Sequence, residues 1–383
     1  MIEILGKLLE GAALFFAPGG WKYIVMIVVG LVIIGLAIFK DYEPLLLLPI
    51  GFGCILCNIP LSHAVGAEGF LTALYDFGIA NELFPVLLFI GIGAMCDFNT
   101  MFTQPITLFF GAAAQFGIFM ALLLAVCCNF FLPDPFTIHE AAAIGIIGAA
   151  DGPSAIMIGN LFAPKYMGSI MVAAYSYMSL VPIIQPPVIR AITTKKERMI
   201  RMTVNYEQKA PRHIRILFPI IVTLVAGIVA PMSTSLVGAL MFGNLLKECL
   251  VTDKLSKTAE NELSNLITLL LGITIGSTMR AQDFLTLHTA LILGIGLLAF
   301  VFDTAGGVVF AKIVNLFMAE DKKINPMVGA CGISAFPMSA RVIQKMALEE
   351  DPTNFILMPA IGANVAGQIG SIIAAAMILS IFG

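Results

Sequence analysis

A single carboxylate in an apolar stretch is the feature of this sequence most able to do chemistry. Asp151 lies in Gly148-Ala-Ala-Asp-Gly-Pro-Ser-Ala-Ile156, inside a run of membrane length, Ala141–Pro164, that holds no other charged residue. An ionised side chain at mid-bilayer costs about 2.5–3.5 kcal/mol or more unless a cation, a proton or water compensates it. Gly152 and Pro153 break a helix beside the carboxylate and free backbone carbonyls for the same ion. The pattern indicates cation transport.

Other polar side chains could complete such a site. The candidates in the last two apolar runs are Asn325, Ser334, Ser339, Asn364 and Ser371. A carboxylate with amide, hydroxyl and carbonyl oxygens suits sodium or a proton and is poor for a transition metal. The four histidines are scattered, and the seven cysteines form no framework.

Four further residues could take part in proton transfer, anion binding or an ion pair. Tyr177, or the nearby Tyr175, could donate or relay a proton, although each could equally be an aromatic residue with a satisfied hydroxyl. Arg341 could hold a carboxylate anion or only anchor a helix at the membrane interface. Asp303 could pair with Lys312 in the same run, although a separation of nine residues does not favour direct contact.

The elements that must position these residues are membrane helices. The chain is 59% hydrophobic and 12% charged over 383 residues, which excludes a soluble globular domain. Apolar runs of spanning length predict an all-α polytopic protein with about eleven transmembrane segments. They lie near 22–39, 44–58, 84–97, 104–131, 139–163, 168–190, 215–243, 262–280, 287–317, 325–345 and 354–382.

The two ends of the chain are expected on opposite sides of the membrane. With eleven spans, thirteen Lys and Arg residues fall on the N-terminal side and seven on the other. This bias predicts a cytoplasmic N-terminus and a C-terminus outside. Residues 1–17 show no cleavable signal and are predicted to form an amphipathic helix at the interface.

The segment around Asp151 has a counterpart later in the chain. Gly145-x-x-Gly148-x-x-x-x-Pro153 and Gly329-x-x-Gly332-x-x-x-x-Pro337 share one spacing, and Leu87–Met95 resembles Leu269–Met279. These matches predict two five-helix repeats that insert in opposite directions, with broken helices meeting at the bilayer midplane. The expected organisation is an N-terminal helix pair at 1–43, a first repeat at 44–190, a basic cytoplasmic loop at 191–214 and a second repeat at 215–383.

Several long motifs in order resemble one known family. They include Gly-Ala-Ala-Asp151-Gly-Pro-Ser-Ala, Tyr-Ser-Tyr177-Met-Ser-Leu-Val-Pro-Ile-Ile-Gln-Pro-Pro187, Asn244-Leu-Leu-Lys-Glu-Cys249, Leu255-Ser-Lys-Thr-Ala-Glu-Asn-Glu262, Pro337-Met-Ser-Ala-Arg341 and Asn364-Val-Ala-Gly367. Over essentially its whole length the chain resembles the membrane β subunit of the biotin-dependent, sodium-pumping decarboxylases, which act on oxaloacetate, methylmalonyl-CoA or glutaconyl-CoA.

The resemblance implies that this subunit decarboxylates carboxybiotin, consumes a proton and exports sodium across the bacterial inner membrane. By motif, Asp151, Asn325, Ser334 and Asn364 would bind sodium. Tyr177, Asn325 and Arg341 would meet carboxybiotin, and Asp151, Tyr177 and Arg341 would be catalytic. The implied partners are a carboxyltransferase α subunit, a separate biotin carrier and a small membrane anchor subunit, in an oligomer that binds no nucleic acid.

Two other function classes remain open from the residues. A sodium/proton antiporter or sodium–solute symporter without decarboxylase chemistry would also need broken helices and one aspartate. A purely structural membrane anchor explains an intramembrane Asp151 less well. The sequence leaves the carboxylic acid substrate undetermined, because the β subunit would receive carboxybiotin in every case.

Overall fold

The computed structural model describes residues 11–383 apart from 41, 104, 203–209 and 230, and those residues form helices and loops without a strand. Four helices are long and apolar enough to cross a membrane, and two bent helix pairs raise that number to six. The pairs bend by 61° and 68°. The chain is therefore a polytopic membrane protein. Most of the predicted amphipathic helix at 1–17 and part of the 191–214 loop lie outside the described residues.

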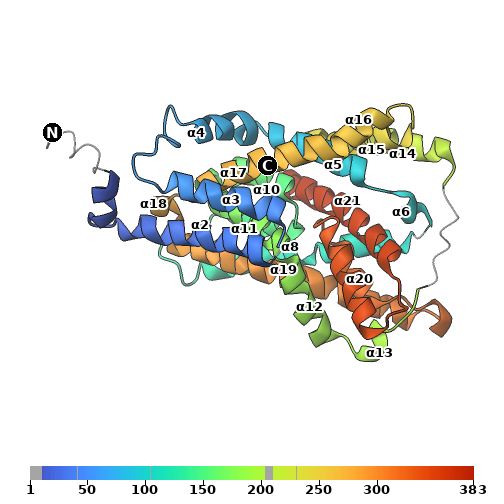
Figure 1. Ribbon diagram of the computed structural model, residues 1–383. Helices are drawn as coiled ribbons and strands as arrows, with labels where there is room; N and C mark the ends of the chain where they lie inside the picture. The colour runs from blue at the N-terminus through green and yellow to red at the C-terminus, as the bar shows by residue number, and fades with distance from the viewer. Residues whose placement is uncertain (1–10, 41, 104, 203–209, 230) are drawn as a thin grey trace.

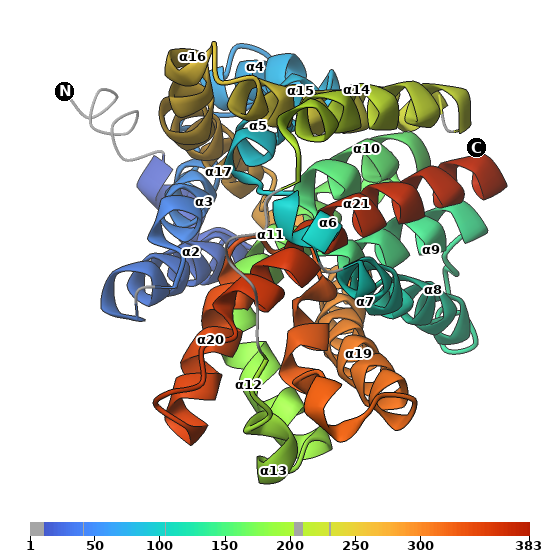
Figure 2. The same cartoon turned by 90° about the vertical axis from the view of Figure 1, so that its right-hand side faces the viewer.

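The helices are described in two consecutive runs of the chain, 21–198 and 212–382 (Figures 1 and 2). The first run is α2 (Trp21–Lys40), α3 (Pro44–Cys57), α4 (Phe70–Leu74), η1 (Tyr75–Ala80), α5 (Leu83–Met95), α6 (Asn99–Thr103), α7 (Ile106–Ala114), α8 (Phe116–Cys128), α9 (Ile138–Gly145), η2 (Ile146–Ala149), α10 (Gly152–Phe162), η3 (Pro164–Tyr166), α11 (Met167–Ser179), α12 (Val181–Ile192) and α13 (Lys195–Arg198). The second run is α14 (Arg212–Val229), η4 (Pro231–Ser233), α15 (Thr234–Glu248), α16 (Asp253–Thr258), η5 (Ala259–Leu263), α17 (Ser264–Ser277), α18 (Ala281–Phe284), α19 (Leu287–Leu316), η6 (Glu320–Lys322), η7 (Pro326–Gly332), α20 (Met338–Glu350) and α21 (Leu357–Phe382).

The 139–163 run does not cross the molecule as expected. Thr137 and Glu140 form a capping box at the start of α9, and the helix breaks at Ala150, which has a left-handed φ of 53°. α10 then returns to the end from which α9 came. The ring of Phe162 lies 5.4 Å from that of His139. The run is a hairpin because Asp151-Gly152-Pro153 cannot continue the helix.

The 325–345 run is a second hairpin, which opens at the opposite end. The 3-10 helix η7 enters, and α20 leaves toward the same end. Asn325 before η7 and Asn354 after α20 both donate to the Ile200 carbonyl, at 2.9 Å and 3.3 Å. The prediction of eleven full spans therefore counted two hairpins as crossings.

Both described ends of the chain lie at one end of the molecule, here called the His288 end. The contacts are Gln282 Nε2 to Tyr23 OH (3.0 Å), the His288 ring to the Phe136 ring (5.3 Å), and a His139 ring nitrogen to the Phe382 carbonyl (3.0 Å). The opposite end, here called the Arg198 end, holds α13, the end of α20 and Lys312. The two described ends therefore lie together rather than on opposite sides, because the 215–243 run, counted as one crossing, is two antiparallel helices, α14 and α15, joined at their far ends by the Arg215–Glu248 ion pair.

Glycines allow very close packing where the two runs meet. A Cβ at Gly53 of α3 would lie 2.2 Å from the Ile273 carbonyl oxygen of α17, and one at Gly243 of α15 would lie 1.9 Å from the Ile90 oxygen of α5. Small residues let membrane helices approach at this distance. α3 thus packs on α17, and α5 on α15.

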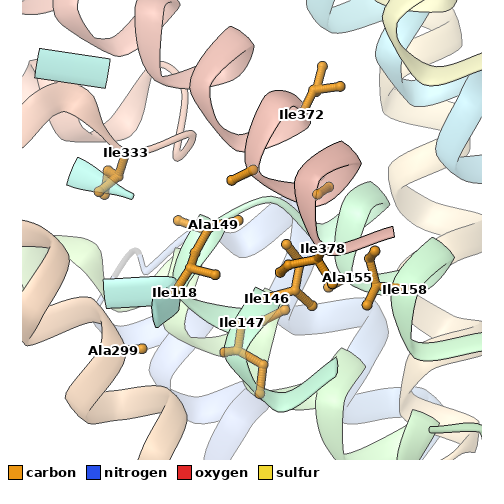
Figure 3. Packing of buried hydrophobic residues seen from close by; sticks show 14 of the residues in the cluster. Ile118, Ile146, Ile147, Ala149, Ala155, Ile158, Ala299, Ile333, Ile372 and Ile378 are labelled. Atoms are coloured by element: carbon orange, nitrogen blue, oxygen red, sulfur yellow. The ribbon is translucent and has the colours of Figure 1, made fainter. Parts of the chain in front are cut away.

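Aliphatic side chains fill the space around the two hairpin tips. Figure 3 shows Ala149, Ile118, Ile146 and Ile147 below α21, with Ile333 farther to one side, and each is buried. This packing keeps lipid and bulk water from the polar residues described next.

Candidate functional site

Asp151 is buried at the tip of the first hairpin. Its side chain is 4% exposed, and Oδ2 accepts hydrogen bonds from Ser154 Oγ at 2.5 Å and Ser371 Oγ at 3.2 Å. The residue precedes the first turn of α10, where free backbone N–H groups and the helix dipole favour a negative charge. Ser371, a candidate from the sequence, therefore does face Asp151.

One face of α21 connects both hairpin tips. Asn364, Gln368 and Ser371 recur at the helical spacing of four and three residues, so their side chains share a face. Asn364 Nδ2 donates to the Ile333 carbonyl at 2.6 Å, and Gln368 Nε2 donates to the Ser334 carbonyl. Because Ser371 bonds Asp151, the second tip and Asp151 are held against the same helix.

The second tip contributes the Ser334 hydroxyl and several backbone carbonyl groups. Ser334 Oγ donates to the Gly367 carbonyl at 2.9 Å. A Cβ at Gly367 would lie 2.5 Å from the Gly332 oxygen, so only glycine permits this approach of tip and helix. Gln115, at the break between α7 and α8, donates to the carbonyl oxygens of Gly111 (3.0 Å) and Gly332 (3.4 Å).

Three buried oxygens near this junction have no hydrogen-bond partner among the described residues: Asn364 Oδ1, Gln115 Oε1 and Tyr175 OH. A buried polar group without a partner costs about 1–3 kcal/mol, so an ordered site usually supplies one. Amide oxygens beside a carboxylate and serine hydroxyls form a set of hard oxygens. Such a set can hold a hard cation such as sodium or a proton.

The two tyrosines occupy different places. Tyr175 packs against the hairpin tip, because a Cβ at Gly152 would lie 2.0 Å from its ring carbon Cζ. Tyr177 OH instead donates to the Leu293 carbonyl of α19 at 2.6 Å, and its ring packs on Phe300. The tyrosine beside Asp151 is thus Tyr175, whereas the sequence favoured Tyr177.

Asn325 lies at the Arg198 end, away from the hairpin tips. Its Nδ2 donates to the carbonyls of Arg198 (2.7 Å) and Ile200 (2.9 Å), and its Oδ1 accepts from Met327 N. The structure therefore brings together Asp151, Ser334 and Asn364 but not Asn325. Asn325 instead holds the base of the second hairpin.

Arg341 is exposed on α20. It lines an open pocket of about 440 Å³ with Gln344, Lys345, Leu348, Glu349 and Leu357. Within the described ranges no carboxylate lies within 4 Å of Arg341, whereas Glu349 is paired with Arg190 at 2.8 Å. The guanidinium is thus available to an anion at the mouth of the second hairpin.

Ion pairs fix the Arg198 end. Arg198 pairs with Glu350 and Arg201 with Asp351, each at 2.7 Å. The Thr353 backbone N–H, then its hydroxyl, then Arg201 lower the pKa of Asp351 from 3.8 to about 2. Because this pKa is lowered, the stabilisation is present above the unfolded value and is lost only as pH falls toward 2. The basic loop expected at 191–214 therefore binds the acidic end of α20.

Sequence reasoning did not select Ser154, Gln368 or Gln115. Ser154 follows Asp151 by three residues, which is the spacing of a side chain bonded across a helix start. Gln368 follows Asn364 by one helical turn. Both signals were present in the sequence, whereas the role of Gln115 depends on a helix break that no Pro marks.

Comparison with known proteins shows the family of the chain. Residues 22–382 match the family model described as the Na⁺-transporting oxaloacetate decarboxylase beta subunit. The chain belongs to this family. The match includes both hairpins, α21 and every residue of the Asp151 site.

Curated relatives of this β-subunit family cover almost the whole chain. The methylmalonyl-CoA decarboxylase subunit beta of Veillonella parvula is 48% identical over 93% of this chain and 92% of its own. The glutaconyl-CoA decarboxylase subunit beta of Acidaminococcus fermentans is 46% identical over 96% and 95%. The oxaloacetate decarboxylase beta chain of Klebsiella pneumoniae is 41% identical over 99% of each.

Proposed function

We propose that this β subunit releases CO2 from carboxybiotin and uses that reaction to export sodium, with Asp151 as the central ion ligand. The observation that carries the proposal is the junction of two hairpin tips on one face of α21, with Asp151 bonded to Ser371. Ser154, Ser334, Asn364 and the missed residues Gln115 and Gln368 would complete the oxygen set. Family membership favours this function over an antiporter or symporter without decarboxylase chemistry.

The chemistry requires a proton donor and two conformational states. Loss of CO2 leaves an anion on the ureido nitrogen of biotin, which a positioned acid must protonate. In this proposal Tyr177 supplies or relays that proton and Arg341 binds the carboxylate of carboxybiotin. Coupling requires that carboxybiotin and sodium each prefer one state over the other.

An inverted repeat would supply the two states. The order of helices in 21–192 resembles that in 212–382, with α2 corresponding to α14 and the first hairpin to the second. The hairpins open at opposite ends, and the contacts of α3 with α17 and of α5 with α15 exchange equivalent helices, as an internal two-fold axis requires. These features support two inverted halves around the site. They also move the proposed start of the first half from residue 44 to α2, whereas the second half, predicted from 215, already included α14.

We further propose that the Arg198 end faces the cytoplasm, so that both described termini lie outside. Sixteen of the described Lys and Arg residues lie toward the Arg198 end. Only three lie toward the His288 end, namely Lys22, Lys165 and Arg280. Positive residues mark the cytoplasmic side. The stronger bias arises because two counted crossings are hairpins and because the 215–243 run is two crossings, α14 and α15.

Cysteine labelling tests this orientation. With exposed Cys127 replaced by serine, Asp134→Cys should react in intact cells with a membrane-impermeant maleimide, because Asp134 is exposed at the His288 end. Lys196→Cys should react only after the cells are opened. The reverse labelling pattern would contradict the orientation.

Separate roles for the two tyrosines give a second prediction. Tyr177→Phe should lower the rate of carboxybiotin decarboxylation at least about 100-fold, the usual worth of a general acid, with little change in half-saturating sodium. Tyr175→Phe removes a hydroxyl beside Asp151 and should instead raise half-saturating sodium about tenfold. Steady-state kinetics of CO2 release at varied sodium distinguish the two. If only Tyr175→Phe lowers the rate, Tyr175 rather than Tyr177 is the general acid.

The partners follow from the proposed chemistry. The biotin would come from a separate carrier, loaded by a carboxyltransferase α subunit, with a small membrane anchor subunit completing an inner-membrane complex. The acid that is decarboxylated is oxaloacetate, methylmalonyl-CoA or glutaconyl-CoA, as in the relatives. The test is to purify the intact complex through this subunit and assay the three acids. We expect a biotinylated chain in the complex and sodium-stimulated CO2 release from one acid; sodium flux without biotin would contradict the proposal.

A further inference from the structure

A second buried carboxyl group lies outside the Asp151 site. Asp303, in the middle of α19, is 0% exposed; the Gly117 backbone N–H approaches its carboxyl group, but neither carboxyl oxygen makes a well-aligned hydrogen bond within the described part of the chain. The hydroxyl of the adjacent Thr304 is also buried without a partner in the described part of the chain. Buried ionised groups are paired in proteins because desolvation of an isolated charge is very costly.

Lys312, the candidate partner of Asp303 from the sequence, bonds other groups. Lys312 Nζ donates to the Ile192 carbonyl at 2.8 Å and pairs with Glu197 at 3.0 Å. No cation lies beside Asp303 among the described residues, and a buried carboxyl group without a counter-charge is more stable in its protonated form.

Asp303 points at the start of α8, just past the break at Gln115. A Cβ at Gly117 would lie 2.1 Å from Asp303 Oδ1 and 2.4 Å from the Ala299 carbonyl oxygen. Glycine therefore leaves the space that the carboxyl group occupies. The end of α8 that meets Asp303 is an N-terminus, whose dipole and free N–H groups favour a carboxylate. The carboxyl group of Asp303 therefore lies beside a helix N-terminus that would stabilise its ionised form if water reached it.

The contact joins the two runs of helices, because α8 belongs to the first and α19 to the second. A relative movement of the runs would change the water around Asp303. The titratable side chains on the elements that pack on α19 are Tyr175 and Tyr177 on α11, Cys127 and Cys128 on α8, His139 and Glu140 on α9, Cys331 on η7, Asp151 after η2 and Arg190 on α12. Tyr177 is bonded to Leu293, and Arg190 to Glu349.

We propose that Asp303 is a second proton-binding site, which holds a proton while α8 and α19 are packed and releases it when the halves move apart. The O–H bond breaks with its electron pair kept by the carboxylate, and the proton passes to water admitted at the contact. A proton is proposed as the ligand because it needs only one oxygen, whereas hard cations take about six oxygen ligands. The inference rests on the proposed function in requiring that the halves move.

Infrared difference spectroscopy of the purified complex, between sodium-free and sodium-saturated states, tests this site without biotin turnover. We expect a carboxylic acid C=O band that changes on sodium addition, shifts in Asp303→Glu and is absent in Asp303→Asn. Proton release on sodium addition, followed with a pH indicator, should fall by one proton per chain in Asp303→Asn.

Identical difference spectra and proton release for wild type and Asp303→Asn would overturn the proposal and leave Asp303 as a permanently neutral packing group. If Asp303→Asn does not fold, an unshifted band in Asp303→Glu overturns it equally. Sodium-stimulated CO2 release by the wild-type complex is measured separately. Its absence would refute the proposed function, whereas its presence with unchanged spectra would refute only the role of Asp303.

Discussion

Asp151→Asn is expected to lower sodium-dependent decarboxylation of carboxybiotin at least about 100-fold. The carboxylate accepts hydrogen bonds from Ser154 and Ser371. Bonds to a charged group contribute about 1.5–3 kcal/mol each, and each 1.36 kcal/mol corresponds to a factor of ten. Asparagine keeps the shape of the side chain but removes the charge that would bind sodium. CO2 release from the purified complex, at saturating biotin carrier and varied sodium, measures the loss.

The matched control is Asp134→Asn, the same substitution on an exposed carboxylate at the His288 end, which pairs loosely with Lys165 at 3.4 Å. An exposed pair of this kind contributes at most about 1 kcal/mol, so its activity should be unchanged. Carboxyl transfer on the partner subunit should continue in both variants. Equal activity of the two variants would remove Asp151 from the ion site.

Gly152→Ala is the second substitution with a large expected effect. The added methyl group would lie 2.0 Å from Tyr175 Cζ and 2.4 Å from its hydroxyl oxygen, so the hairpin tip or the ring must move. Inserting a methyl group into a packed interior costs about 1–3 kcal/mol. Because the displaced residue follows Asp151, decarboxylation should fall at least about tenfold. Thermal unfolding in detergent and sodium-dependent CO2 release measure the two effects.

Gly294→Ala in α19 is the control, because no atom lies within 4 Å of the position its methyl group would take. Removing the obstruction in Gly152→Ala/Tyr175→Ala should recover part of the lost thermal stability, which a double-mutant cycle quantifies. Equal unfolding temperatures for Gly152→Ala and Gly294→Ala would contradict the close contact between the hairpin tip and Tyr175.

Part of this site was predictable from the sequence, because a lone Asp151 beside Gly152-Pro153 identifies a broken helix in the membrane. Ser334 and Asn364 followed from the second break and the glycine-rich last helix. The course of the chain at the breaks was not predictable. A broken apolar run has the same composition whether it crosses the membrane or turns back, and only contacts such as His139 with Phe162 decide between the two.

Sequence reasoning also differed from the account above in the membrane side assigned to some residues and in the contacts assigned to others. Counting 215–243 as one crossing, although α14 and α15 cross there in turn, placed Lys247 and Lys322 opposite the 191–214 loop and so weakened the charge bias. Spacing along a helix could not place Tyr175 rather than Tyr177 beside Asp151, because α11 packs one on Gly152 and the other on α19. Asn325 was assigned to the ion site from its motif, yet its side chain bonds the 198–200 backbone.

Coupling itself is the central claim, and simultaneous measurement of CO2 and sodium in proteoliposomes tests it most directly. The intact complex is reconstituted with its biotin carrier, the substrate acid is added outside, and released CO2 and internal ²²Na⁺ are followed together. We predict that both rise with a fixed ratio and that Asp151→Asn abolishes both while carboxyl transfer to biotin continues. Undiminished sodium uptake in Asp151→Asn, or CO2 release that does not depend on sodium, would contradict the coupling.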